Sequence, residues 1–263
     1  MSLIIYDEVT AKQQVYESNL RLGRDTSSSG YGCQERLSDF GCVPGVRKST
    51  SRVQRVPRSE WERLIDEGKG NWLSDIRGRK IKPHNQGRTP LCWMHGSVRA
   101  MEVLRLYEGQ LPKLLSAECA AKQITGGRMR GGMPEEALQH LRMVGTCEQN
   151  LWPLNSFDVN LADPSWKEDQ HRHRILEWLD VENFDDQMTL ALNRIPVAIG
   201  LRWWGHLVCQ LDPVYLGSGV FGIGIDNSWD TTWGDWGYGI LTEKYGTADL
   251  GAFAPISETF SNN

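Results

Sequence analysis

The stretch Asn85-Gln86-Gly87-Arg88-Thr89-Pro90-Leu91-Cys92-Trp93 decides the fold of this 263-residue chain. It places the side-chain amide of Gln86 six residues before the thiol of Cys92. Further along, apolar residues recur at helical spacing as far as Glu108, and Gly109 is a suitable helix terminator. Cys92 is therefore expected in the first turn of a helix, where unpaired backbone amides and the helix dipole stabilise a thiolate.

Two downstream residues complete a set of side chains that suits nucleophilic catalysis. His206 lies in an apolar run, and Asn227 opens the segment Asn-Ser-Trp-Asp-Thr-Thr-Trp-Gly. An imidazole exchanges a proton with the thiol, and a carboxamide orients the ring without adding a buried charge. Gln86 would donate to the oxyanion together with the backbone amide of Cys92. The candidate catalytic residues are Cys92, His206, Asn227 and Gln86.

At these residues the sequence resembles the papain family of cysteine peptidases. The order Gln, Cys, His, Asn is the family's order, and the likeness extends roughly from Trp72 to Tyr238. The resemblance implies an α+β fold of two lobes, a helical lobe with the Cys and an antiparallel β lobe with the His and Asn, facing across a cleft. It further implies peptide-bond hydrolysis by a Cys-His-Asn triad with a Gln oxyanion donor.

The resemblance also carries substrate-binding residues over to this chain. Gly131-Gly132-Met133-Pro134 resembles the double-glycine segment that pairs with an extended substrate backbone. Met133 and Pro134 would help line the main specificity pocket, although Met133 also fits an ordinary core position. Trp229 would shield the His-Asn hydrogen bond from water, and Trp233 would lie at the leaving-group side. The resemblance implies an endopeptidase that prefers an apolar or bulky residue two positions before the cut.

The chain departs from the family pattern at several positions around the proposed nucleophile. The usual disulfide next to the nucleophile has no counterpart, because its positions hold Thr89 and, approximately, Met129. The departures within the motifs are Pro90-Leu91 for Gly-Ser, Met94-His95 for a small residue and an aromatic, and Asp230 for Gly.

Composition indicates a globular protein and excludes several classes of function. The net charge of −4 gives no general case for nucleic-acid binding, and no apolar run approaches the ~20 residues that span a bilayer. The first residues do not read as a secretory signal, so we expect a cytoplasmic or assembly-associated protein. Six cysteines in a chain of this length do not make a disulfide scaffold, and Cys33 and Cys42 are expected to be thiols although they could pair. No metal motif such as CxxC or HExxH appears, and no cofactor is expected.

The N-terminal segment, residues 1–58, is expected to be an extension of the peptidase domain at residues 59–263. From Pro44 to Arg58 it carries basic residues and no acid. A solvated linker, an inhibitory propeptide and a docking arm for an acidic protein partner all fit this pattern. We favour docking, because the long charged-aromatic helix of the family's usual propeptides is absent. The basic residues are Arg47, Lys48, Arg52, Arg55 and Arg58.

Local patterns predict helices in the first part of the chain and strands in the second. The predicted helices are Val9–Leu22, Glu60–Glu67, Ser116–Gln123, Pro134–Val144 and one within Trp178–Leu192. Leu73–Lys82 is expected to be extended. The predicted strands are Val197–Leu201, His206–Leu211, Val220–Ile225 and Tyr238–Thr242.

Thiol-dependent peptide hydrolysis, with a protein or peptide as substrate, is the function that these patterns favour. An alternative is a structural or interaction protein of a larger assembly, such as a virus particle, with a weak or vestigial site. Acyl transfer to an amine, as in transglutaminases, shares the thiol mechanism, but Asn227 and Gln86 fit the peptidase pattern better.

Overall fold

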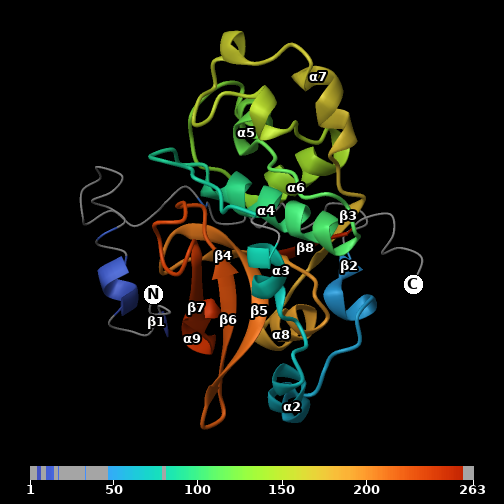
Figure 1. Ribbon diagram of the computed structural model, residues 1–263, viewed down its shortest axis with the longest axis vertical. Coiled ribbons are helices and arrows are strands. Elements are labelled where there is room, and N and C mark those ends of the chain that lie inside the picture. The colour runs from blue at the N-terminus through green and yellow to red at the C-terminus, as the bar shows by residue number, and fades with distance from the viewer. Residues whose placement is uncertain are drawn as a thin grey trace.

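The computed structural model of the chain describes residues 5–6, 10–14, 17, 33, 47–78 and 81–256. Within them a helical half and a sheet half meet along one central helix, α4 (Figure 1). The predicted α+β class is confirmed. Of the helix predicted for Val9–Leu22, residues 10–14 and 17 are helical, and the rest lies outside the described residues, as does Cys42.

The central helix α4 (Cys92–Tyr107) is buried along almost its whole length. Its predicted start at Cys92 is confirmed, and Gly109 follows the helix end with a φ of +77°, a conformation that glycine adopts without strain. The side chains on its predicted apolar face are at most 1% exposed and form the core of the helical half. They are Met94, Val98, Met101 and Leu104.

The two other helices predicted in the helical half are present, whereas α7 was not predicted. The Ser116 hydroxyl accepts a hydrogen bond from the backbone N–H of Cys119 (3.2 Å) at the start of α5 (Ala117–Thr125). Pro134 takes the first position of α6 (Pro134–Met143), where a missing N–H costs nothing. The outer part holds α7 (Trp166–Asp169) and 3-10 turns at Gln149–Leu151, Val159–Leu161 and Gln170–Arg172.

The sheet half is built on one eight-stranded sheet in the order β1-β7-β6-β5-β4-β8-β3-β2. The six inner strands pair antiparallel, whereas β1 and β2 pair parallel at the two edges. All four predicted strands are present, and the sequence reasoning missed β1, β2, β3 and β8. The strands are β1 (Ile5–Tyr6), β2 (Arg47–Lys48), β3 (Glu177–Asp180), β4 (Val197–Leu201), β5 (His206–Gly217), β6 (Val220–Asp226), β7 (Tyr238–Thr242) and β8 (Ala252–Ile256).

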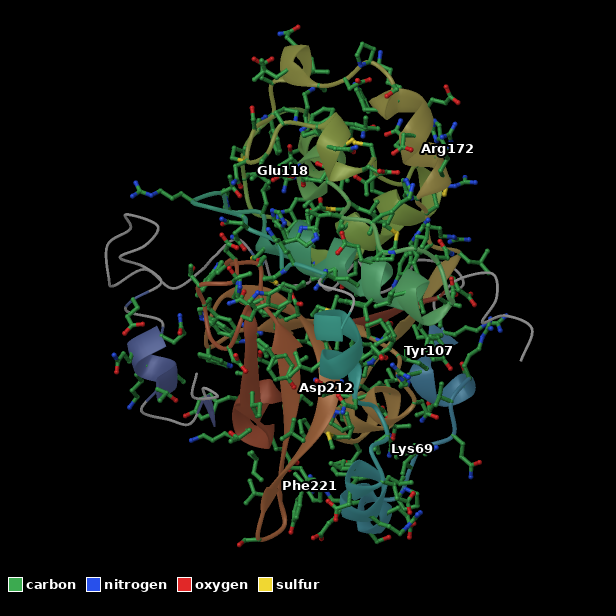
Figure 2. The ribbon with its side chains drawn as sticks, in the orientation of Figure 1. Lys69, Tyr107, Glu118, Arg172, Asp212 and Phe221 are labelled. Atoms are coloured by element: carbon green, nitrogen blue, oxygen red, sulfur yellow. The ribbon has the colours of Figure 1, made fainter. Side chains whose placement is uncertain are left out.

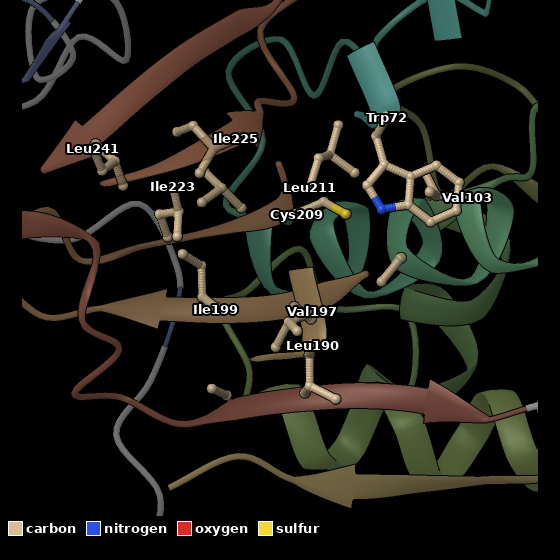
Figure 3. Close-up of a cluster of buried hydrophobic side chains, with 14 of the residues drawn as sticks. Trp72, Val103, Leu190, Val197, Ile199, Cys209, Leu211, Ile223, Ile225 and Leu241 are labelled. Atoms are coloured by element: carbon tan, nitrogen blue, oxygen red, sulfur yellow. The ribbon is translucent and has the colours of Figure 1, made fainter. Parts of the chain in front are cut away.

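A hydrophobic core joins the sheet to the helices packed against it. In Figure 3, Trp72 and Val103 reach this core from helices, whereas Ile199, Leu211 and Ile225 come from strands. Each of the five is at most 2% exposed, so each contributes roughly 1.5–3 kcal/mol of burial free energy. The helices and short turns of the sheet half are α2 (Trp61–Asp66), α3 (Trp72–Gly78), α8 (Phe184–Leu192), α9 (Glu243–Gly246), Ser49–Ser51 and Arg58–Glu60.

The extended segment predicted at Leu73–Lys82 is wrong, because α3 (Trp72–Gly78) occupies most of it. The carboxylate of Asp212, on β5, accepts hydrogen bonds from the backbone N–H groups of Trp72 and Leu73. Figure 2 labels Asp212 next to this helix. An acceptor distant in the chain thus satisfies the first amides of α3, and no local pattern reveals it.

The basic run of the N-terminal extension lies against acidic residues of the same chain. Lys48 pairs with Glu182 at 2.6 Å, and Arg55 pairs with Asp186 at 2.7 Å. Arg58 pairs with Glu243 at 2.5 Å. A further ion pair joins Arg52 and Glu177.

None of the helices in the described part of the chain combines the length and apolarity that crossing a membrane requires.

Candidate active site

Cys92 is the first residue of α4, so its sulfur lies at the positive end of the helix dipole. Leu91 precedes the helix, and its carbonyl accepts the backbone N–H groups of Met94 (2.9 Å) and His95 (3.0 Å). The side chain of Leu91 is fully buried in the helical half, which gives this departure from the family pattern a packing role. Cys92 itself is 0% exposed.

His206 is the first residue of β5 and lies where the sheet meets α4. Gly96 makes this approach feasible, because a Cβ atom at that position would come within 2.2 Å of Leu207 Cδ2. The first turn of α4 and the start of β5 therefore touch. The structure thus brings Cys92 from the helical half and His206 from the sheet half to the same junction.

Asn227 orients the imidazole of His206. Its Oδ1 lies 2.8 Å from His206 Nε2 and accepts the backbone N–H of Ser228, also at 2.8 Å. Because Oδ1 accepts, His206 Nε2 carries a proton. The indole of Trp229 lies over the ring, with centroids 4.9 Å apart and an interplanar angle of 30°. Both His206 and Asn227 are 0% exposed, so their hydrogen bond is shielded from water.

The loop that carries Gln86 is fixed to the segment that carries Asn227. The backbone N–H of Gln86 donates to the carbonyl of Ser228 (2.9 Å), and the Ser228 hydroxyl donates to Gln86 Oε1 (2.5 Å). Gln86 Nε2 donates to the carbonyl of Thr89 at 2.8 Å. A carboxamide nitrogen has two N–H bonds, so one donor is committed to the loop and a second one exists for another acceptor.

Asp230 stands where the family has glycine. The backbone conformation at this position explains why the family prefers glycine there. Its φ is +66°, in the left-handed region that favours glycine but that Asp tolerates better than most residues. Its carboxylate accepts from the backbone N–H of Thr231 (2.7 Å) and from Asn85 Nδ2 (3.2 Å). These bonds compensate for the backbone conformation and link the Asn227 segment to the Gln86 loop.

The double-glycine segment lies beside the residue that follows Cys92. A Cβ atom at Gly132 would come within 2.7 Å of the indole of Trp93, so only glycine fits there. The backbone of Gly132 forms a parallel bridge with Cys33 of the N-terminal extension. Met133, 7% exposed, and the buried Pro134 follow, at the start of α6.

A second residue of the N-terminal extension contacts the other side of this region. Trp233 Nε1 donates to Oε1 of Gln14 at 3.4 Å. Trp233 packs edge-to-face against Trp229, with centroids 6.2 Å apart. Gln14 and Cys33 therefore lie against two of the positions predicted to bind substrate, Trp233 and Gly132.

Burial governs the ionisation of the groups at the junction. It lowers the pKa of His206 to about 4, although the hydrogen bond to Asn227 acts in the opposite direction. Burial raises the pKa of Cys209 well above the usual value. It also raises the pKa of Cys33, where the nearby Cys92 adds to the effect. Cys33 and Cys209 are therefore protonated near pH 7. None of the described cysteines forms a disulfide.

A buried polar network under the junction was missed by the sequence reasoning. Arg99 of α4 donates from Nη2 to Asp226 (2.7 Å), next to Asn227, and from Nη1 to Glu102 (3.1 Å). Glu102 lies 3.0 Å from His84 Nε2, and His84 Nδ1 lies 3.1 Å from His95 Nδ1. The signal in the sequence was His95, which stands where the family has an aromatic residue.

Both buried carboxylates of this network, Asp226 and Glu102, contact the guanidinium of Arg99. Burial disfavours ionisation of Arg99, but the carboxylates of Asp226 and Glu102 outweigh it and raise the pKa of Arg99. Burial likewise opposes ionisation of Glu102, yet His84 and Arg99 lower its pKa. Burial lowers the pKa of His95 well below its usual value, and His84 adds to this effect, so His95 is neutral near pH 7.

One group of described residues has a spacing that would suit a metal ion, apart from this junction. Ligand atoms of Glu148, Asp169 and His173 lie within 4.8 Å of one another. Lys113 already forms an ion pair with Glu148, and His173 Nε2 lies 3.3 Å from Asp169. These contacts within the protein account for the positions of the three side chains.

The architecture matches solved cysteine proteases at low sequence identity. Xylellain, a cysteine protease from Xylella fastidiosa, superposes with a TM-score of 0.62 at 16% identity, over 87% of this chain and 96% of that chain. Digestive procathepsin L 3 of Tenebrio molitor larval midgut gives 0.58 at 16%, over 92% and 79%. The Carica candamarcensis cysteine protease CMS1MS2, solved in complex with E-64, gives 0.52 at 21%, over 71% and 96%.

No protein-family model matches the chain. At these identities the superpositions establish the fold: the chain has the two-lobed papain-like fold that the sequence predicted.

Proposed function

We propose that this papain-fold chain is a cysteine peptidase that hydrolyses peptide bonds through acylation of Cys92. The observation that supports this most is the buried hydrogen bond between His206 Nε2 and Asn227 Oδ1 (2.8 Å), at the junction where α4 begins with Cys92. An imidazole held in one tautomer beside a helix-start thiol is what cysteine nucleophiles require. The resemblance of the fold to solved cysteine proteases points the same way.

The proposed reaction begins with proton transfer from the Cys92 thiol to His206 Nδ1, since Nε2 is bonded to Asn227. The thiolate attacks the substrate carbonyl carbon, and the oxyanion accepts hydrogen bonds from Gln86 Nε2 and the backbone N–H of Cys92. His206 then protonates the leaving amine, which leaves a thioester on Cys92. A water molecule, deprotonated by His206, hydrolyses the thioester and restores the thiol.

In this proposal the described structure is a resting state of the peptidase, in which the site is closed to substrate. Cys92, His206, Asn227 and Gln86 are all 0% exposed, and Cys33 already bridges to the backbone of Gly132. A substrate backbone and Cys33 would compete for the same edge. Because burial lowers the pKa of His206 to about 4, the imidazole is neutral near pH 7 in this state. Substrate entry would therefore require the contacts of Gln14 and Cys33 to open.

The proposed substrate is an extended peptide with an apolar or bulky side chain two positions before the cut. Its backbone would pair with Gly131 and Gly132, and its side chain would pack near Met133 and Pro134. Trp233 would contact the leaving-group side.

Labelling with an epoxide thiol inhibitor, followed by peptide mapping, tests the proposal. We expect modification at Cys92 and its absence in Cys92→Ala, which should also abolish hydrolysis of a peptide library. Burial raises the pKa of Cys33 and of Cys209, so both should label more slowly. Preferential labelling of either one would refute the assignment. Labelling of Cys92 without any peptide cleavage would favour an interaction protein with a vestigial site.

A further inference from the structure

A basic hollow lies at the far end of α4 from the candidate active site. It has a volume of about 540 Å³ and is formed by the last turns of α4 and α6 and by the segment 171–176. From Cys92 to Arg105 the helix rises by about 20 Å, at 1.5 Å per residue. In Figure 2 the labelled Arg172 lies on the same side of the molecule as Tyr107, the last residue of α4. The hollow is therefore separate from the proposed catalytic residues.

The charged lining of this hollow carries a net positive charge. Four arginines face it and Glu108 is its one acidic lining residue. The two helix C-termini contribute roughly half a negative charge each, which offsets about one arginine. Arg172 is also paired with Glu168 at 2.8 Å. A net positive charge of about one remains after these deductions, in a chain whose overall net charge is −4. The arginines are Arg105, Arg142, Arg172 and Arg174.

Two of these arginines are available for a ligand. Arg142 and Arg174 are exposed and make no hydrogen bond or ion pair with other residues of the described part of the chain. Arg105 is half-buried, and its Nη1 donates to the carbonyl of Arg172 at 3.3 Å. Burial lowers the pKa of Arg105, since nearby acids compensate only in part. An anion in the hollow would supply the missing counter-charge.

The floor of the hollow is apolar. Met101, Leu104 and Ile175 line it but are at most 4% exposed, so they add little accessible surface. Met143 and Leu176 form the rim and are 66% and 39% exposed, unusually high values for side chains of this size. A simple oxyanion would use the arginines but not this surface, whereas an organic anion would use both. The volume lies within the ~300–1,000 Å³ typical of small-molecule sites.

We infer that this hollow binds a small phosphate-bearing organic molecule, with the phosphate on Arg142 and Arg174 and the apolar part against Met143 and Leu176. Guanidinium groups bind phosphate oxygens in a bidentate manner, and two of them match a dianion. The inference does not depend on the proposed peptidase function, because none of these residues contacts Cys92, His206 or Asn227 in the interactions described above.

Adenosine 5′-monophosphate and inorganic phosphate are suitable probes, measured by isothermal titration calorimetry on the full chain at constant ionic strength. We expect saturable binding of the nucleotide, and weaker binding of inorganic phosphate because it lacks an apolar part. The double variant Arg142→Gln/Arg174→Gln should weaken nucleotide binding by about tenfold or more, since two charge-assisted contacts are lost. A matched control is Arg128→Gln/Lys167→Gln, two exposed cations of the same half that do not line the hollow.

The outcomes separate the competing explanations. Unfolding midpoints without ligand should be equal in all three proteins, because each substitution is at an exposed position. Equal nucleotide affinity in both double variants would overturn the assignment to this hollow. Absence of saturable binding by either probe would overturn the site altogether. Equal affinities for the two probes would overturn the role of the apolar side chains of Met143 and Leu176. Tighter binding of a glutamate-rich peptide than of the nucleotide would overturn the small-molecule ligand in favour of an acidic protein segment.

Discussion

Gln86 and Asn227 carry the same functional group, yet their surroundings differ. Asn227 Oδ1 is an acceptor for the His206 ring and for a backbone N–H, so it sets the orientation of the base. Gln86 is hydrogen-bonded to Ser228 and Thr89, and its proposed role is to donate to the oxyanion of a bound substrate. Loss of the Asn227 side chain should therefore lower the reactivity of the Cys92 thiol. Loss of the Gln86 side chain should lower the turnover of substrate.

Replacement of each carboxamide by Ala tests this division. Gln86→Ala should lower kcat by roughly 10²-fold, the cost of one oxyanion donor, with little change in the rate of Cys92 alkylation. Asn227→Ala should lower both rates, because His206 loses its fixed tautomer. Gln139→Ala, at an exposed position of α6, serves as the control. Equal effects of the two active-site variants on alkylation would contradict the assigned roles.

At the scale of single elements, α4 links several parts of the site through its polar face. Arg99 and Glu102 join it to Asp226, which precedes Asn227, and to His84, which precedes the Gln86 loop. The helix that carries Cys92, the proposed nucleophile, thus also holds the strand end and the loop that carry the other proposed catalytic residues. The network ties α4 to both segments, which are also joined to each other by the hydrogen bonds between Gln86 and Ser228.

Arg99→Met should cost roughly 3–5 kcal/mol in the free energy of unfolding, because it leaves two carboxylates buried without their cation. Urea titration at pH 7 measures this value. The control is Arg63→Met, which breaks exposed pairs with Glu60 and Glu67 and should cost less than about 1 kcal/mol. Comparable losses in the two variants would mean that the network contributes no more than a surface ion pair.

Helix α6 carries a group that couples stability to pH. Burial lowers the pKa of His140 to about 4, whereas an unfolded histidine titrates near 6.5. Below pH 6.5 the unfolded chain therefore binds this proton more readily than the folded chain. The stabilisation is complete above that pH and is lost as the pH falls toward 4.

On acidification from pH 7 to pH 5, the titration of His140 should lower the free energy of unfolding by about 1–2 kcal/mol. The measurement is the free energy of unfolding of wild type and His140→Gln at both pH values. The variant should lose less on acidification than the wild type by about that amount. His206 and His95 titrate in the same direction, so the wild-type loss should exceed the contribution of His140 alone. An identical pH dependence in both proteins would contradict the assignment.

Local sequence signals predicted the helices and strands that are stabilised by contacts within the same segment. Ser116 and Pro134 start their helices by contacts within one turn, and the helix from Cys92 follows from its own apolar spacing. Helix α3 could not be predicted, because its first amides bond to Asp212 on β5. The buried network was invisible for the same reason, since its partners meet only after the two halves have packed.

At the scale of the whole molecule, described residues of the predicted N-terminal extension contact the rest of the chain. Its basic residues, expected on sequence grounds to serve an acidic partner, have acidic partners on β3, α8 and α9 of the same chain or next to them. Because the basic side chains form these ion pairs, they are less available to bind another protein. Docking to a partner remains a prediction, and any partner would have to compete with these pairs.

Arg55→Gln tests how firmly the extension is held. The side chain of its partner Asp186 is 2% exposed, so loss of the cation should cost about 1–3 kcal/mol of stability. Arg58→Gln breaks a pair whose side chains are 47% and 42% exposed and should cost less than about 1 kcal/mol, with strong dependence on salt. Unfolding in urea at low and high salt measures both values. Unchanged stability in Arg55→Gln, together with loss of a binding partner, would favour a docking arm.

The edge strands β1 and β2 have a consequence for proteolytic processing. Each is two residues long, and together they cover the outer sides of β7 and β3. An uncovered sheet edge presents unpaired N–H and C=O groups that recruit strands from other molecules. A cut after Arg58 would leave both edges covered for as long as the severed piece stayed bound. Its departure would expose both edges and favour lateral association and precipitation, so cleavage and release would have separate effects on solubility.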